Sequence, residues 1–130
     1  MDPHIEQILK ALDMFKDWSN YLLVTTVAAL GWVATTNRPN ISPKALRWTI
    51  GALGASTVFG IFTLALIPLV AEGVTTDTPS FYDVVGRFNL LWMLPPRVPL
   101  TLKWVCWPQH ILFLVGIVVF TVGRIRTQKP

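Results

Sequence analysis

The apolar positions of this chain gather in three long uninterrupted runs, separated by shorter segments in which polar and apolar residues alternate with helical spacing. The longest run, residues 45–71, carries no charge between Arg47 and Glu72. A helix needs roughly 20 apolar residues to cross a hydrocarbon core of about 30 Å. A chain of 130 residues is too short to bury such a helix on all sides. We therefore predict that residues 45–71 span a membrane.

The other two runs predict two further spans. Residues 19–36 contain four threonines, which a membrane helix tolerates because their hydroxyls can bond to carbonyls one turn earlier. The Asn- and Pro-rich segment 37–44 predicts a tight turn, so the first two spans form an antiparallel hairpin. Residues 104–123 are the third span, followed by a short basic tail at 124–130. Aromatic residues typical of the membrane–water interface flank the runs: Trp18, Tyr21, Trp48, Trp92, Trp104 and Trp107.

Two segments outside the spans predict amphipathic helices. Residues 1–18 place their large apolar residues on one face: Ile5, Ile8, Leu9, Leu12 and Phe15. This segment is expected to lie at the interface or to extend the first span, and the alternative is a docking helix for a partner. Residues 79–94 lie between a Thr-Pro start and a Pro-Pro stop, and predict a second interfacial helix. The expected fold is an all-α integral membrane protein of one domain, with three transmembrane helices and two amphipathic interfacial helices.

Composition and charge agree with a membrane protein. Hydrophobic residues make up 52% of the chain and charged residues 14%, against roughly 25% charged residues in a typical soluble domain. The net charge of +4 comes from short basic clusters beside the apolar runs. That placement fits lipid headgroups and not nucleic acid. The first loop and the tail hold six basic residues and no acid, which predicts a bacterial-type inner-membrane protein with its N-terminus outside and its C-terminus cytoplasmic.

Small residues recur along one face of the second span. Ala52, Ser56 and Gly60 follow one another at four-residue spacing, and Gly51 with Ala55 runs beside them. Such residues let two helix backbones approach closely in lipid. The face predicts either self-association of the chain or packing against its own neighbouring spans.

The sequence offers little chemistry. Cys106 and His110 are four residues apart on one helical face, but a metal site needs further ligands and a nucleophile pair needs an orienting third group. No cofactor or metal is expected. Gln109, His110, Cys106 and Glu72 remain the polar candidates near or inside the membrane, where polar groups are often functional. The alternative is that they lie in the headgroup region or bond across the bundle.

These patterns favour a small non-enzymatic membrane protein that acts by assembly, as an accessory subunit of a larger complex or as a homo-oligomer. Its expected partners are the lipid bilayer and either another protein or further copies of itself. Three spans, an outside N-terminus and a short basic tail are similar to the outline of one class of phage holins, which would imply an oligomeric pore. The weakly polar spans argue against a water-filled lesion. A membrane enzyme that uses Cys106 and His110 is a remote alternative.

Overall fold

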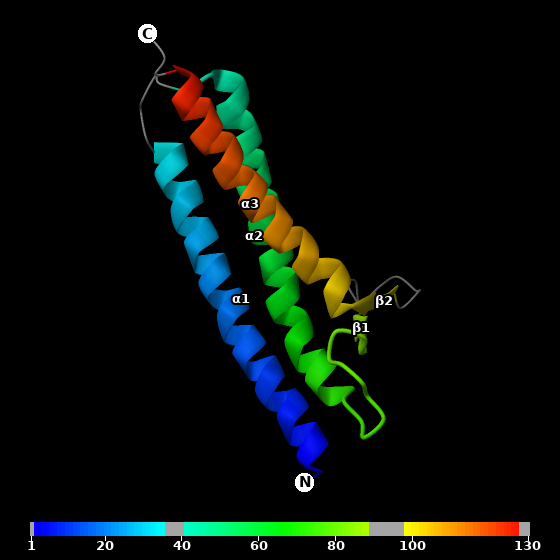
Figure 1. Cartoon of the computed structure of the whole chain (residues 1–130). Helices are drawn as coiled ribbons and strands as arrows, with labels where there is room; N and C mark the ends of the chain where they lie inside the picture. The colour runs from blue at the N-terminus through cyan, green and yellow to red at the C-terminus, as the bar shows by residue number, and fades with distance from the viewer. Residues whose placement is uncertain (1, 36–40, 89–97, 128–130) are drawn as a thin grey trace.

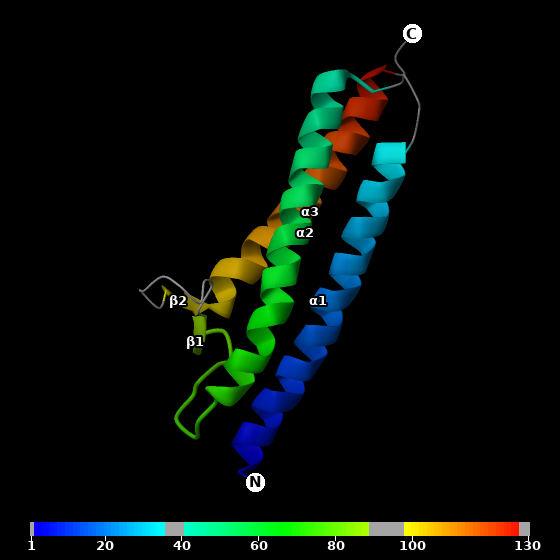
Figure 2. The same ribbon diagram turned by 180° about the vertical axis from the view of Figure 1, so that it is seen from behind.

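Three long helices form the body of the molecule in a computed structural model that describes residues 2–35, 41–88 and 98–127 (Figure 1). They are α1 (Pro3–Thr35), α2 (Pro43–Glu72) and α3 (Leu102–Thr127). α1 and α3 run in the same direction, and α2 runs antiparallel to both, as the view from behind also shows (Figure 2). α2 packs against each of the other two helices. The prediction of a helical bundle is confirmed.

α1 joins the predicted amphipathic segment and the first predicted span in one continuous helix. It begins where Asp2 accepts a hydrogen bond on Oδ1 from the backbone N–H of His4 at 2.9 Å, with Pro3 in the first helical position. No further proline interrupts its 33 residues, so it extends for about 50 Å at 1.5 Å per residue. α1 is therefore longer than the hydrocarbon core of a bilayer.

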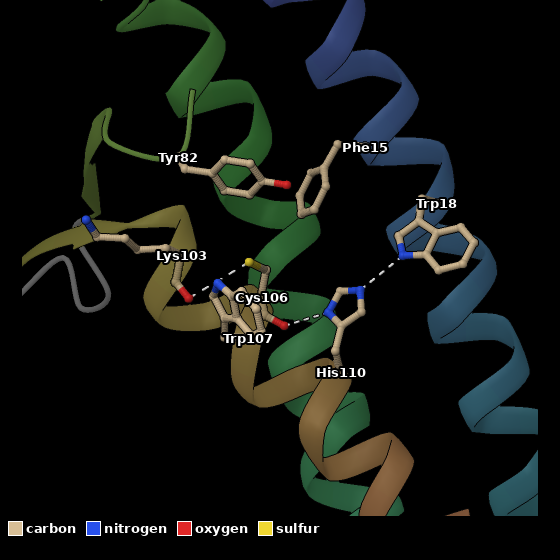
Figure 3. A pocket seen from close by; sticks show the side chains of 7 residues that line it. All are labelled: Phe15, Trp18, Tyr82, Lys103, Cys106, Trp107 and His110. Atoms are coloured by element: carbon tan, nitrogen blue, oxygen red, sulfur yellow. Dashed lines mark hydrogen bonds between the residues drawn. The ribbon is translucent and has the colours of Figure 1, made fainter. Parts of the chain in front are cut away.

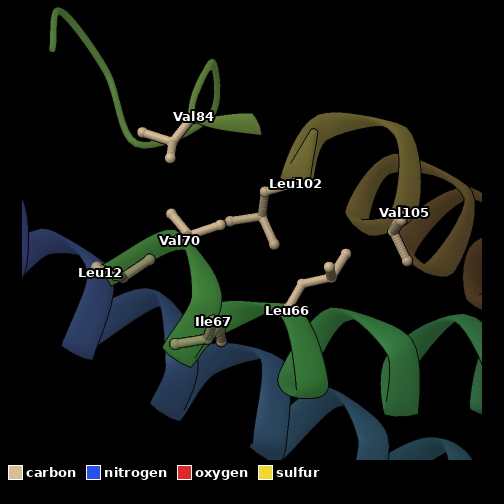
Figure 4. Packing of buried hydrophobic residues seen from close by; sticks show 7 residues of the cluster. All are labelled: Leu12, Leu66, Ile67, Val70, Val84, Leu102 and Val105. Carbon is tan, nitrogen blue, oxygen red and sulfur yellow. The ribbon is translucent and has the colours of Figure 1, made fainter. Parts of the chain in front are cut away.

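The apolar face of the N-terminal part of α1 is covered by the chain itself. Leu12 is buried in the same cluster as Ile67 and Val70 of α2 (Figure 4). The start of α3 and the loop after α2 complete this cluster, whose buried members are Leu12, Leu66, Ile67, Val70, Val84, Leu102 and Val105. Since this face already has a partner within the chain, residues 3–18 form an extension of the bundle.

α2 and α3 start from different local signals. Ser42 caps α2 by accepting a hydrogen bond on Oγ from the backbone N–H of Ala45 at 3.3 Å, and Pro43 follows it. α3 begins directly after a strand and ends with Arg124 and Arg126 in its last turn, where basic residues stabilise the carbonyl end of a helix. In the described part of the chain, α2 and α3 are the two helices that are long and apolar enough to cross a membrane.

The interfacial helix predicted for residues 79–94 is wrong over residues 79–88. Residues 81–83 form a turn and bend, and β1 (Val85–Phe88) pairs antiparallel with β2 (Val98–Thr101). The remaining residues of that prediction, including Trp92, lie outside the described residues. Ser80 explains part of the difference, because its carbonyl and hydroxyl accept from the backbone N–H groups of Asp83 and Tyr82 and so compete with helix formation.

Tertiary packing explains the rest. Val84 is 8% exposed and belongs to the buried cluster at this end of the bundle. The β-branched residues Val84 and Val85 favour extended backbone, and Val85 begins β1, where it pairs with Thr101. The helical spacing of the apolar residues in 79–88 therefore predicted the wrong structure, because Val84 is buried by contacts with α2 and α3.

Candidate functional site, an aromatic cavity between α1 and α3

A cavity of about 500 Å³ opens between α1, α3 and the loop that follows α2 (Figure 3). Its volume lies within the range of roughly 300–1,000 Å³ found for small-molecule sites. α1, the loop and α3 contribute the lining side chains, which are Phe15, Trp18, Tyr82, Lys103, Cys106, Trp107 and His110. The structure thus brings together Cys106 and His110, two of the four polar candidates from the sequence, with two of the predicted interfacial tryptophans.

Helical periodicity places the α3 side of this cavity. Lys103, Cys106, Trp107 and His110 follow one another at i, i+3, i+4 and i+7 and so share one face of α3. The sequence predicts the Cys106–His110 part of this face. Phe15, Tyr82 and Lys103 were not predicted as part of a site, because no local pattern links Phe15 and Tyr82 to α3 or marks Lys103 as a lining residue.

His110 is held at both ring nitrogens. Nδ1 lies 2.7 Å from the carbonyl oxygen of Cys106, and the indole N–H of Trp18 donates to Nε2 at 3.0 Å. A carbonyl only accepts and an indole N–H only donates, so the imidazole is neutral with its proton on Nδ1. The Cys106 thiol is directed to the carbonyl oxygen of Lys103 at 3.9 Å. Neither nitrogen of His110 is therefore left to take the proton of this thiol.

The remaining polar groups of the cavity are a paired lysine and a tyrosine. Lys103 donates from Nζ to Asp83 Oδ1 at 2.9 Å, which balances the charge at the rim. The Tyr82 ring contacts Phe81 with centroids 4.2 Å apart and Phe15 at 5.7 Å. Partial burial, and secondly the neighbouring Cys106, raises the pKa of the Tyr82 phenol. The phenol therefore stays protonated and remains a hydrogen-bond donor.

Gln109 lies in the bundle core and does not line the cavity. Its side chain is fully buried, and its backbone carbonyl accepts a hydrogen bond from Ser56 Oγ at 2.7 Å. A Cβ atom at Gly60 would lie 2.9 Å from Nε2 of Gln109 and 3.0 Å from Cδ1 of Leu23. Neither atom of the Gln109 amide has a hydrogen-bond partner within the described residues. The three helices thus meet at an unpaired amide that rests on Gly60.

The small-residue face of α2 divides between this core and the surface. Ala52, Ser56 and Gly60 are buried and Ala55 is half-buried, whereas Gly51 is exposed with nothing within 4 Å of a Cβ built on it. The buried members pack inside the bundle.

The other predicted candidates lie at the ends of the helices. Glu72 is the exposed last residue of α2. The predicted interfacial aromatics that the structure describes are all exposed: Trp18, Tyr21, Trp48, Trp104 and Trp107.

Neither a metal-ligand cluster among the described residues nor a resemblance to known proteins assigns a role to this cavity. Over residues 2–35, 41–88 and 98–127, no group of three or more His, Cys, Asp or Glu side chains is placed to hold a metal ion. Comparison with protein-family models, curated proteins and solved structures finds no match to this chain.

Proposed function

We propose that this chain is a three-span integral protein of a bacterial inner membrane that acts by assembly and not by catalysis. It would serve as an accessory subunit of a larger complex or as a homo-oligomer. The observation that carries the three-span part of this proposal is the depth at which α1 lies beside α2 and α3.

Three contacts set that depth. Trp18 donates a hydrogen bond to His110. Cδ1 of Leu23 lies 3.0 Å from the position that a Cβ at Gly60 would occupy. The ring centroids of Trp32 and Phe120 are 5.3 Å apart in an edge-to-face arrangement. Residues 18–32 of α1 therefore lie alongside the apolar parts of the two other helices. If α2 and α3 cross a bilayer, this part of α1 lies at the same depth.

The surface of α1 at this depth suits lipid. Its exposed side chains include Val24, Val27 and Trp32. The hydroxyls of Thr25 and Thr26 donate to carbonyls four residues earlier at 2.8 and 2.7 Å, which satisfies them without water. A third crossing is consistent with these contacts.

The ends of the bundle support an orientation. Exposed aromatic residues lie toward the start of α3. Trp104 and Trp107 are in its first two turns, and Trp18, which precedes Tyr21 by one turn of α1, bonds to His110 of α3. Such residues are expected near a membrane interface. Basic residues gather at the opposite end, in the first turns of α2 and the last turns of α3: Lys44, Arg47, Arg124 and Arg126. We assign this basic end to the cytoplasm.

Two alternatives have less support. A water-filled pore needs a polar face along a span, but the exposed large side chains of α2 and α3 between the two ends are apolar, among them Val58, Ile61, Leu114 and Val118. A thiol enzyme needs a base for Cys106, and His110 has both nitrogens engaged.

Single cysteines in a Cys106→Ser background test the three crossings. Cysteines at Asp2 and Thr76 should react with a membrane-impermeant thiol reagent on intact cells, and those at Asn40 and Thr127 only after the cells are opened. If the cysteines placed at Asp2 and at Asn40 both react on intact cells, α1 does not cross the membrane. Reaction of Asn40 and Thr127 from outside would reverse the orientation.

Native mass spectrometry from detergent tests assembly. We expect either more than one copy of the chain in one particle or a second protein that stays bound. A lone chain, extracted under conditions that preserve other inner-membrane complexes, would contradict the proposal.

A further inference from the structure

The walls of the cavity between α1 and α3 are mostly aromatic. Phe15, Trp18, Tyr82 and Trp107 supply four of its seven lining side chains. Aromatic rings favour a flat partner, because offset stacking and edge contacts need a planar surface. The shape and lining of the cavity thus suit a planar ring better than a flexible chain.

The polar side chains that line the cavity offer mainly hydrogen-bond donors. Tyr82 O–H and Trp107 N–H have no hydrogen-bond partner in the described parts of the chain, and Lys103 keeps donors beyond its bond to Asp83. The lining that the structure describes includes no carboxylate and no side-chain amide. A ligand that brings acceptor oxygens would therefore satisfy this cavity better than one that brings donors.

The charge of the site favours a neutral ligand. Lys103 is the one cationic side chain among the described lining residues, and Asp83 pairs with it at 2.9 Å. His110 is neutral, since its Nε2 accepts from Trp18. A phosphate or carboxylate would meet no unbalanced positive charge here, whereas carbonyl oxygens need only a donor.

We infer that this cavity binds an uncharged planar ring carrying carbonyl oxygens on an apolar tail, which is the chemistry of a lipid-soluble quinone. The ring would stack among Phe15, Trp18 and Tyr82, and its carbonyls would accept from Tyr82 O–H and Trp107 N–H. Trp18 and Trp107 are 59% and 64% exposed. On the proposed function these tryptophans lie at the interface, so the ligand would enter from the bilayer.

The test is a titration of the purified protein in detergent with a short-tailed, fully substituted benzoquinone, followed by quenching of tryptophan fluorescence. A fully substituted ring has no free position at which the Cys106 thiol could add. We expect saturable quenching, reported as its midpoint. An alkylbenzene with the same tail should not compete, because it lacks the carbonyls.

Two variants remove a donor and leave an aromatic ring at the position. Tyr82→Phe and Trp107→Phe should each raise the midpoint roughly two- to tenfold, the usual range for one neutral hydrogen bond. Trp48→Phe is the matched control, because Trp48 is similarly exposed but lies in the first turns of α2, away from the cavity. Its midpoint should equal that of the wild type, and circular dichroism should show equal helicity for all three variants.

Several outcomes would overturn the inference. Quenching that does not saturate would mean that no site exists, and equal competition by the alkylbenzene would mean that the carbonyls are not recognised. Displacement of the quinone by phosphatidylglycerol at equal concentration would identify a phosphate site instead. The cysteine-labelling experiment uses no ligand, so a failure here leaves the three-span proposal to be judged separately.

Discussion

Trp18 of α1 donates its indole N–H to Nε2 of His110 of α3 at 3.0 Å, across 92 positions of the sequence. This bond joins the two parallel helices of the bundle, which are connected along the chain only through α2 and the strand pair. It also fixes the proton of His110 on Nδ1 and forms one wall of the aromatic cavity. This contact therefore links the position of α1 to the hydrogen bonding of the candidate site.

Removing this bond should loosen α1 modestly. Trp18→Phe keeps an aromatic ring but loses the donor, so we expect the free energy of unfolding to fall by about 0.5–1.5 kcal/mol, the usual value of a neutral hydrogen bond. Denaturant titration in detergent micelles measures the change. A double-mutant cycle with His110→Leu isolates the pair, and a coupling energy of zero would show that the bond contributes nothing to stability.

The helices were predictable from the sequence because each apolar run is bounded by local signals. The run predicted at 45–71 became Pro43–Glu72, and the run predicted at 104–123 became Leu102–Thr127. Pro43 and the basic residues of the last turn of α3 set those ends, and both can be read within a few positions. The loop after α2 was not predictable in this way, since the burial of Val84 depends on α2 and α3 together.

The candidate site was predictable only along one helix. The spacing of Cys106 and His110 showed that they share a face of α3, but the bond from Trp18 has no local pattern that could reveal it. Tyr82 was assigned to a helix that the structure replaces with a turn, so its place in the cavity could not be foreseen. Contacts between distant elements decide which polar residues meet.

Val84 tests the packing of that loop against the bundle. Val84→Ala removes two buried methyl groups from the cluster and should lower the free energy of unfolding by about 1–3 kcal/mol. Val58→Ala is the control, because Val58 is 51% exposed on the outer face of α2, and its cost should be much smaller. Thermal unfolding measures the melting temperature of both variants, and equal decreases would mean that the loop does not pack as described.

The unpaired amide of Gln109 predicts a gain in stability on removal. A buried polar group without a partner costs about 1–3 kcal/mol, and Leu has a similar volume. Gln109→Leu should therefore stabilise the bundle by about 1 kcal/mol or more, whereas Ser56→Ala should destabilise it by losing the bond to the Gln109 carbonyl. Chemical denaturation provides both values. A loss of stability in Gln109→Leu would reveal a bound water or another partner for the amide.

The two glycines of the small-residue face predict opposite behaviour. At Gly60 a Cβ would lie 2.9 Å from Gln109 and 3.0 Å from Leu23, whereas nothing lies within 4 Å of one at Gly51. Gly60→Leu should overpack the meeting point of the three helices and cost about 1–3 kcal/mol. Gly51→Leu adds the same side chain at an exposed position, where leucine favours the helix over glycine, so it should leave the protomer as stable as before or more so.

Each glycine variant can lose either the folded protomer or the oligomer, and the one that is lost shows whether the glycine packs within the chain or against another copy. Because Gly60 packs within the bundle, Gly60→Leu should cause the protomer itself to aggregate on extraction, as size-exclusion chromatography would show. If the exposed Gly51 side of α2 instead faces another copy of the chain, Gly51→Leu should release folded protomers from an oligomer, since lipid adapts to a bulky residue and a packed helix does not. An unchanged oligomer in Gly51→Leu would place the assembly surface elsewhere, and unchanged stability in Gly60→Leu would contradict the close packing of α2 against α1 and α3.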